Sequence, residues 1–274
     1  MHILDGGLSN ALEARGHDLT QEGWTASVLR EQPAEILEVH RGYFQAGADV
    51  ATTASYQETD PGLLRLSVEL AKEAAGEASD RLVAASVGPY GAILGDGSEY
   101  RGHYGLTAQE LELFHRPRIE ALVAAGPDLL AIETIPDTDE AAVLAKLLTE
   151  FDYPAWFSYS TDGGRTCAGQ ELAEAFAIAA AVDSVVAVGV NCCPPTEVLA
   201  AMKIAAKTGK AGVTYPNAGE IWDAENSQWF GSTSYDPELV PDWIGSGARW
   251  IGGCCRVGTE AITQIAERAG ACDA

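Results

Sequence analysis

Short apolar runs recur along the chain, and each is followed by a longer segment whose apolar residues repeat with helical spacing. In segment 34–46, for example, Ile36, Val39 and Tyr43 return at intervals of three and four residues, which is typical of one buried helix face. The short runs predict strands at 3–5, 49–54, 82–87, 129–133, 155–159, 186–191, 211–215 and 250–253. The longer segments predict helices at 34–46, 61–78, 107–125, 137–149, 169–181, 195–208, 237–246 and 258–269.

Strands that alternate with helices predict a parallel sheet. Eight such units in 274 residues favour an α/β fold of one (β/α)8 TIM barrel, with residues 1–274 as a single domain. A doubly wound open sheet is the competing architecture, but no glycine-rich nucleotide fingerprint follows the first strand. Two segments, 95–105 and 217–235, are expected to be long irregular loops.

Acidic residues dominate the charge of the chain. It carries 40 acidic and 17 basic residues, which gives a formal net charge of −23. This charge repels nucleic-acid phosphates and anionic lipids, so neither a nucleic acid nor a membrane is an expected partner. The start of the chain lacks the basic and apolar segments of a secretion signal, which favours a cytoplasmic protein. The expected partners are small molecules, and the oligomeric state stays open.

Unusual polar residues stand where the predicted strands end. Asp5 ends the first strand and is followed by Gly6 and Gly7, while Glu133 and Asn191 end the fourth and sixth strands. The carboxyl ends of barrel strands share one face, and that face carries the active site in enzymes of this fold. A carboxylate such as Glu133 inside an apolar run is costly unless it is paired or binds something. These residues are therefore expected to line a binding site.

Cysteines give the second chemical signal. Four of the six form two adjacent pairs, Cys192–Cys193 and Cys254–Cys255, at the ends of the sixth and eighth strands. Adjacent side chains of a strand point to opposite faces, so we expect only one of the first pair to face the site. Three thiolates suit Zn²⁺ and leave its fourth position open, as in catalytic sites. A redox site built on vicinal cysteines is the alternative. The remaining two, Cys167 and Cys272, are expected to be small structural residues.

Five segments resemble the homocysteine S-methyltransferase family. They are LDGGLSNALEARG near the start, TTASYQ at 52–57, AIETIPDTDEA at 131–141, GVNCC at 189–193 and GGCCRVGTEAI at 252–262. They span nearly the whole chain in the order of the family. The resemblance implies an enzyme that transfers a methyl group to the thiol of homocysteine, giving methionine, with Zn²⁺ as cofactor.

The same resemblance implies roles for individual residues. Zinc ligands would be Cys192, Cys254 and Cys255, and the substrate sulfur would complete the metal shell. The substrate-binding residues would be Asp5, Gly6, Gly7, Thr53, Ser55, Glu133 and Asn191. Glu133 would accept hydrogen bonds from the substrate ammonium, and backbone N–H groups of the glycine turn would hold its carboxylate. No catalytic residue is expected beyond the substrate thiolate activated by zinc.

The methyl donor is expected to be a sulfonium compound, with S-methylmethionine preferred to S-adenosylmethionine. Thr134 follows Glu133 where the betaine-using branch resembles a Glu-Tyr pair, which argues against betaine. Aromatic residues of the loops are candidates for holding such a cation: Tyr56, Tyr90, Tyr100, Tyr104, Trp222 and Trp229. Two alternatives stay open. The acceptor could be another thiol or selenol such as selenocysteine, or the barrel could be a non-catalytic zinc or redox sensor with a reversible Cys254–Cys255 disulfide.

Overall fold

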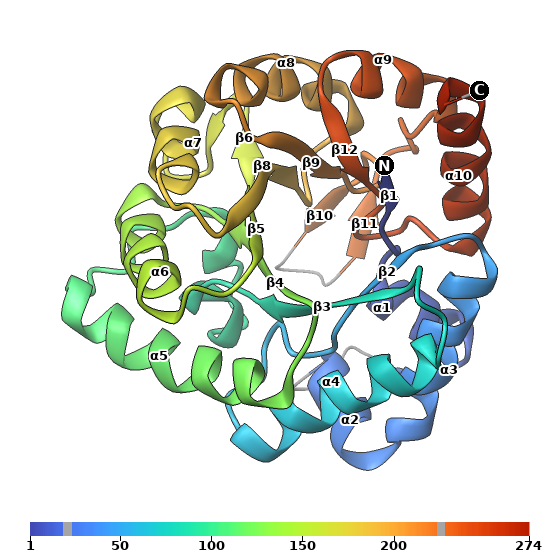
Figure 1. Ribbon diagram of the computed structural model, residues 1–274, viewed down its shortest axis with the longest axis horizontal. Coiled ribbons are helices and arrows are strands. Elements are labelled where there is room, and N and C mark those ends of the chain that lie inside the picture. Colours follow the sequence, from blue (N-terminus) through green and yellow to red (C-terminus); the bar gives the residue numbers. More distant parts are fainter. Residues whose placement is uncertain (19–23, 224–227, 274) are drawn as a thin grey trace.

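A computed structural model describes residues 1–18, 24–223 and 228–273. Its centre is an eight-stranded parallel sheet in the order β1-β12-β9-β8-β5-β4-β3-β2. A parallel bridge between Leu4 and Val50 brings the two edge strands together, so the sheet closes into the ring seen in Figure 1. The strands are β1 (His2–Ile3), β2 (Val50–Thr52), β3 (Leu82–Val87), β4 (Leu129–Ile135), β5 (Ala155–Tyr159), β8 (Val185–Asn191), β9 (Ala211–Tyr215) and β12 (Ala248–Ile251).

Helices surround this ring on the outside (Figure 1). They include α3 (Pro33–Gln45), α4 (Pro61–Ala75), α5 (Ala108–Ala125), α6 (Thr138–Phe151), α7 (Leu172–Ala180), α8 (Pro195–Ala205), α9 (Val240–Gly245) and α10 (Thr259–Asp273). The predicted (β/α)8 TIM barrel is therefore confirmed, and each predicted strand and helix is present within a few residues. Among the described residues, no helix combines the length and the apolar character needed to cross a membrane.

Local capping explains where two of the helices begin. The Asp60 carboxylate accepts hydrogen bonds from the Gly62 and Leu63 N–H groups at the start of α4. At the start of α5, the Thr107 hydroxyl accepts from the Glu110 N–H, while the Glu110 carboxylate accepts from the Thr107 N–H. This reciprocal pair satisfies donors that the helix itself leaves free. Both starts follow from sequence signals.

Short elements escaped the prediction. They are α1 (Leu8–Ala14), α2 (Trp24–Glu31), the hairpin of β6 (Thr161–Asp162) and β7 (Arg165–Thr166), and the pair of β10 (Ile221–Asp223) and β11 (Gln228–Phe230). The expectation that 217–235 is wholly irregular was wrong, because β10 and β11 pair there. Such elements span too few residues for a periodic pattern to stand out.

Two apolar regions hold the barrel together. The larger lies between the sheet and the helices. The smaller fills the inside of the ring, where Trp156 is completely buried and packs with Leu4, Val213 and Tyr215. The indole N–H of Trp156 donates to the Tyr215 hydroxyl over 2.9 Å. Because the interior is packed, the strand ends form a floor for a site rather than the mouth of a channel.

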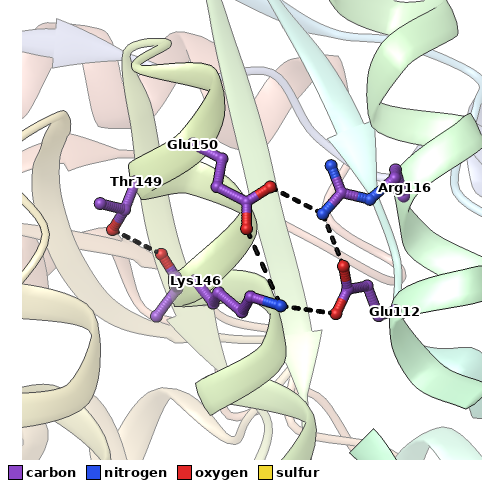
Figure 2. Close-up of polar contacts among 6 residues, drawn as sticks. Glu112, Arg116, Lys146, Thr149 and Glu150 are labelled. Atoms are coloured by element: carbon purple, nitrogen blue, oxygen red, sulfur yellow. Dashed lines mark hydrogen bonds and ion pairs between the residues drawn. The ribbon is translucent and has the colours of Figure 1, made fainter. Parts of the chain in front are cut away.

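Ion pairs connect α5 and α6 on the outer surface (Figure 2). Arg116 of α5 lies 2.6 Å from Glu112 and 2.7 Å from Glu150 of α6. Lys146 of α6 lies 2.7 Å from Glu112 and 3.8 Å from Glu150. These side chains are partly exposed, so each pair contributes less than about 1 kcal/mol to the free energy of unfolding.

Candidate metal centre and substrate site

Three cysteine sulfurs meet at the carboxyl face of the barrel. Cys192 follows β8, and Cys254 and Cys255 follow β12. Their Sγ atoms all lie within 4.8 Å of one another. The intervening strand β9 and the residue after it hold both segments, because the Cys192 N–H donates to the Tyr215 carbonyl and the Cys254 N–H to the Pro216 carbonyl. The structure thus brings together the three predicted ligand groups.

A left-handed turn separates the first two adjacent cysteines. Cys192 has a φ of 48°, a conformation that few residues other than glycine adopt, and its sulfur points to the cluster. Cys193 is fully buried in the core between the sheet and the helices, and burial raises the pKa of its thiol to about 12. The geometry therefore places Cys192 rather than Cys193 beside Cys254 and Cys255.

One disulfide lies within the cluster, between Cys192 and Cys254, whose Cα atoms are 5.4 Å apart. The redox alternative expected a Cys254–Cys255 disulfide, but those two sulfurs are 4.0 Å apart and Cys255 is a free cysteine. Thiolates are the metal ligands, so the same three sulfurs hold a cation only when the disulfide is reduced. Burial raises the pKa of the Cys255 thiol to about 11, and a bound cation is the charge that would keep it ionised at neutral pH. This donor set fits a soft or borderline metal ion.

Two buried carboxylates belong to the same face. Asp5 is 7% exposed and accepts hydrogen bonds from the Thr52 N–H over 2.7 Å and the Thr52 hydroxyl over 2.9 Å. Glu133 is also 7% exposed and accepts from the Ser86 hydroxyl and, over 3.0 Å, from the Tyr215 hydroxyl. Burial raises the pKa of each carboxyl to about 7. Neither has a cationic partner among the described residues, so both are ready to bind one.

A hydrogen-bonded network supports Glu133 from below. Tyr215 donates to Glu133 and receives the Trp156 indole N–H, while the Ser158 hydroxyl lies 2.8 Å from it. Ser158 in turn donates to the Asn191 side-chain oxygen over 2.8 Å. Tyr215 and Ser158 were missed in the sequence, although Tyr215 ends a predicted strand in the same way as Glu133. The network fixes the direction in which the carboxylate points.

The polar residues predicted to line the site are buried and already form hydrogen bonds within the protein. Asn191 accepts from the Thr134 N–H and donates to the Thr134 hydroxyl, which holds Thr134 at a φ of 59°. The Ser55 hydroxyl donates to the Ser86 carbonyl and lies 2.7 Å from the Thr53 hydroxyl. These polar groups therefore shape the wall of the site, and their substrate contacts stay a prediction.

The glycine turn is required by close packing. A Cβ on Gly6 would lie 2.2 Å from the Val257 carbonyl oxygen, and one on Gly7 would lie 2.6 Å from the Cys254 carbonyl oxygen. The turn thus brings the first strand against the loop that carries Cys254 and Cys255. The Gly7 N–H donates to the Val257 carbonyl over 3.0 Å, so this donor already has a hydrogen-bond partner within the protein.

The aromatic candidates divide into two groups. Tyr90 and Tyr104 pack on each other, with ring centroids 5.3 Å apart, and Tyr90 also meets Phe114. Tyr56 packs over Gly88, and Tyr100, which is 37% exposed, lies close enough to Cys255 for that thiol to influence the pKa of its hydroxyl. Of these tyrosines, Tyr100 is thus the one beside the cluster. The side chains of Trp222 and Trp229 lie outside the described residues.

Fold and site together define a (β/α)8 barrel whose carboxyl face carries a cluster of three cysteine sulfurs and two buried carboxylates. The family model of homocysteine S-methyltransferase matches residues 2–269. The chain therefore belongs to the homocysteine S-methyltransferase family.

Individual relatives are similar to this chain along almost its whole length. Homocysteine S-methyltransferase 1 of Zea mays is 40% identical over 97% of this chain and 93% of its own. Selenocysteine Se-methyltransferase of Brassica oleracea var. italica is 41% identical over 97% of this chain and 88% of its own. The solved structure of the homocysteine methyltransferase MmuM from Escherichia coli, in its metallated form, superimposes with a TM-score of 0.86 at 40% identity, covering 98% of this chain and 96% of that one.

Proposed function

We propose that this protein transfers a methyl group from a sulfonium donor to the thiol of homocysteine, giving methionine. One observation carries the proposal: three cysteine sulfurs lie together on the barrel face that also holds Asp5 and Glu133. Thiols that can bind a metal account for activation of a sulfur nucleophile. Buried carboxylates account for recognition of an amino acid.

Zn²⁺ is the proposed metal, held by Cys192, Cys254 and Cys255. Three sulfur ligands leave one of its four positions open, and the borderline-soft ion prefers sulfur and nitrogen donors. When bound, it would lower the pKa of an acceptor thiol and hold the thiolate at neutral pH. Such ligand thiols need a reducing compartment, which supports the expected cytoplasmic location.

The two carboxylates are proposed to bind the ammonium group of homocysteine. Each is buried, and each accepts hydrogen bonds only from neutral groups, so a cation gains a charge-assisted contact with it. The ammonium would favour the ionised form of both groups and lower their pKa from about 7. Both carboxylates lie on the barrel face that carries the cysteine cluster, so an amino acid fixed there would have its side chain on the same face.

Methyl transfer is then a direct displacement. The homocysteine sulfur attacks the methyl carbon, the new S–C bond forms, and the electrons of the breaking C–S bond return to the donor sulfur. The acceptor thiol proton is released to solvent. Alignment of the three atoms is the main demand on the protein, and fixed binding of both substrates supplies it. S-methylmethionine is the preferred donor, with S-adenosylmethionine second.

A selenol acceptor is the second candidate, favoured by the 41% identity to a selenocysteine Se-methyltransferase. Asp5 and Glu133 would bind the ammonium of selenocysteine equally well, because homocysteine and selenocysteine share that group. We therefore expect the side-chain length to decide between the acceptors.

One experiment tests the proposal. The reduced, zinc-loaded protein is incubated with homocysteine together with one candidate donor at a time: S-methylmethionine, S-adenosylmethionine or betaine. The methionine formed in each reaction is quantified. A parallel series replaces homocysteine with selenocysteine. We expect methionine with the sulfonium donors and none above background after the metal is removed. A metal-free protein of full activity would overturn the proposal.

A further inference from the structure

Three buried hydroxyl groups connect the end of β2 to the carboxylate of Glu133. Thr53 and Ser55 follow β2, and Ser86 lies in β3, the strand next to the one that carries Glu133. Thr53 is 3% exposed, and Ser55 and Ser86 are completely buried. The Ser86 N–H donates to the Thr53 hydroxyl over 3.0 Å. A side-chain oxygen therefore takes the place of a main-chain partner just beyond the end of β2.

The hydroxyl protons of Thr53 and Ser55 can each be assigned to one acceptor. A carbonyl only accepts, so the proton between Ser55 and the Ser86 carbonyl, 2.7 Å apart, belongs to Ser55. Ser55 therefore accepts from the Thr53 hydroxyl, which lies 2.7 Å from it. The Ser86 N–H, the two hydroxyls and the Ser86 carbonyl thus form a closed hydrogen-bonded cycle. Neither Thr53 nor Ser55 retains a proton that it could donate to a substrate.

The Ser86 hydroxyl leaves this cycle and binds Glu133. It donates to Oε1 of the carboxylate, while the Tyr215 hydroxyl donates to Oε2 over 3.0 Å. The two donors come from different strands, β3 and β9, so together they fix the plane of the carboxylate. Each oxygen keeps a second acceptor position for a ligand. The main-chain groups of Ser86 are held by the cycle, and its side chain passes that fixed position on to Glu133.

We propose that Ser86 is a positioning residue, which holds the Glu133 carboxylate in the direction that the substrate ammonium requires. Thr53 and Ser55 act through Ser86 and do not donate to the substrate. This inference rests on the proposed function, in which Glu133 binds the ammonium of homocysteine. Without the Ser86 hydroxyl, the ammonium would have to fix the carboxylate itself, so its binding would weaken. Contacts of the substrate sulfur and carboxylate would not change.

Two ligands that differ only in the ammonium test this role. Homocysteine and 4-mercaptobutanoate share the thiol, the carboxylate and the chain length, but the second lacks the amino group. Each is titrated calorimetrically into reduced, zinc-loaded wild type, Ser86→Ala and Ser67→Ala. Ser67 of α4 is the matched control, because it is also completely buried and donates to a main-chain carbonyl, that of Leu64, over 2.7 Å. We expect Ser86→Ala to weaken homocysteine binding about 10-fold and 4-mercaptobutanoate binding less than about twofold, and Ser67→Ala to leave both within about twofold.

Variants of Thr53 test whether it acts through Ser86. Thr53→Val keeps the shape and removes both hydrogen bonds of the hydroxyl, while Thr53→Ser keeps the hydroxyl. We expect Thr53→Val to weaken homocysteine binding about 3- to 10-fold and Thr53→Ser to stay within about twofold of wild type. The double variant Thr53→Val/Ser86→Ala should bind homocysteine no more weakly than Ser86→Ala, because the hydroxyl that Thr53 supports is already absent.

Three results would overturn the inference. Equal weakening of both ligands by Ser86→Ala would show a general loss of structure, and wild-type homocysteine affinity would show that Glu133 needs no support from Ser86. Additive losses in the double variant would give Thr53 a substrate contact of its own. In kinetics, Ser86→Ala should raise KM for homocysteine and leave kcat and the donor KM within about twofold. A wild-type protein that prefers homocysteine to 4-mercaptobutanoate but forms no methionine would refute the proposed function and not the positioning role.

Discussion

Arg118 of α5 is a buried cation that binds the main chain instead of a carboxylate. It is 2% exposed, and its guanidinium lies over the Phe114 ring at 4.8 Å. Its N–H groups donate, each over 3.0 Å, to the carbonyls of Tyr56, Glu58 and Gly88. These carbonyls belong to the loops after β2 and β3, which border the site. Replacing Arg118 with methionine keeps much of the apolar contact and removes the three donors.

The hydrogen bonds and the burial of charge act in opposite directions. Three buried carbonyls that lose their donors cost about 2 kcal/mol each, or about 6 kcal/mol together. Against this, burial lowers the pKa of Arg118 from 12.5 to about 10, which corresponds to about 3 kcal/mol spent on burying the charge. Arg118→Met relieves that cost. We therefore expect the free energy of unfolding to fall by about 3 kcal/mol.

Urea denaturation at neutral pH measures this change, and Arg116→Met on the same helix is the control. Arg116 is about one-third exposed and makes the surface ion pairs of Figure 2, so its loss should cost less than about 1 kcal/mol. If Arg118→Met and Arg116→Met destabilise the protein equally, the main-chain contacts of Arg118 do not have the role assigned to them.

Two further predictions concern pH dependence and acceptor binding. His40 is fully buried with neither ring nitrogen bonded among the described residues, and burial lowers its pKa from 6.5 to about 4. Between these values only the unfolded chain takes up the proton, so stability is lost as the pH falls from 6.5 to 4, by about 3 kcal/mol in total. His40→Leu should remove this contribution, and an unchanged slope of stability against pH would contradict it. Glu133→Gln should raise KM for homocysteine at least about tenfold and leave the metal content unchanged; a wild-type KM would refute the ammonium contact.

The alternating pattern sufficed for the barrel because eight strand–helix units recur along the chain, although β1 and β2 span only two and three residues. Strand ends could therefore be predicted, and with them the positions of Asp5, Glu133 and the cysteines. The choice between Cys192 and Cys193 depended on the resemblance, because the left-handed turn at Cys192 has no signal in its sequence. A strand pattern shows only that the two side chains diverge.

Contacts between segments that are distant in the chain could not be predicted from the sequence. The hydrogen bond from Tyr215 to Glu133 and those from Arg118 to two loops join residues far apart in the chain.

The proposed function requires the three thiols on this face to hold the metal that activates the acceptor. The most direct measurement is the metal content and methyl-transfer rate of reduced Cys192→Ser and Cys193→Ser proteins, each loaded with Zn²⁺ and freed of excess metal. Cys193→Ser is the matched control, since its side chain lies in the core. We expect about one zinc per chain and methionine formation for wild type and Cys193→Ser, with both lost in Cys192→Ser. Full zinc content and activity in Cys192→Ser would contradict it.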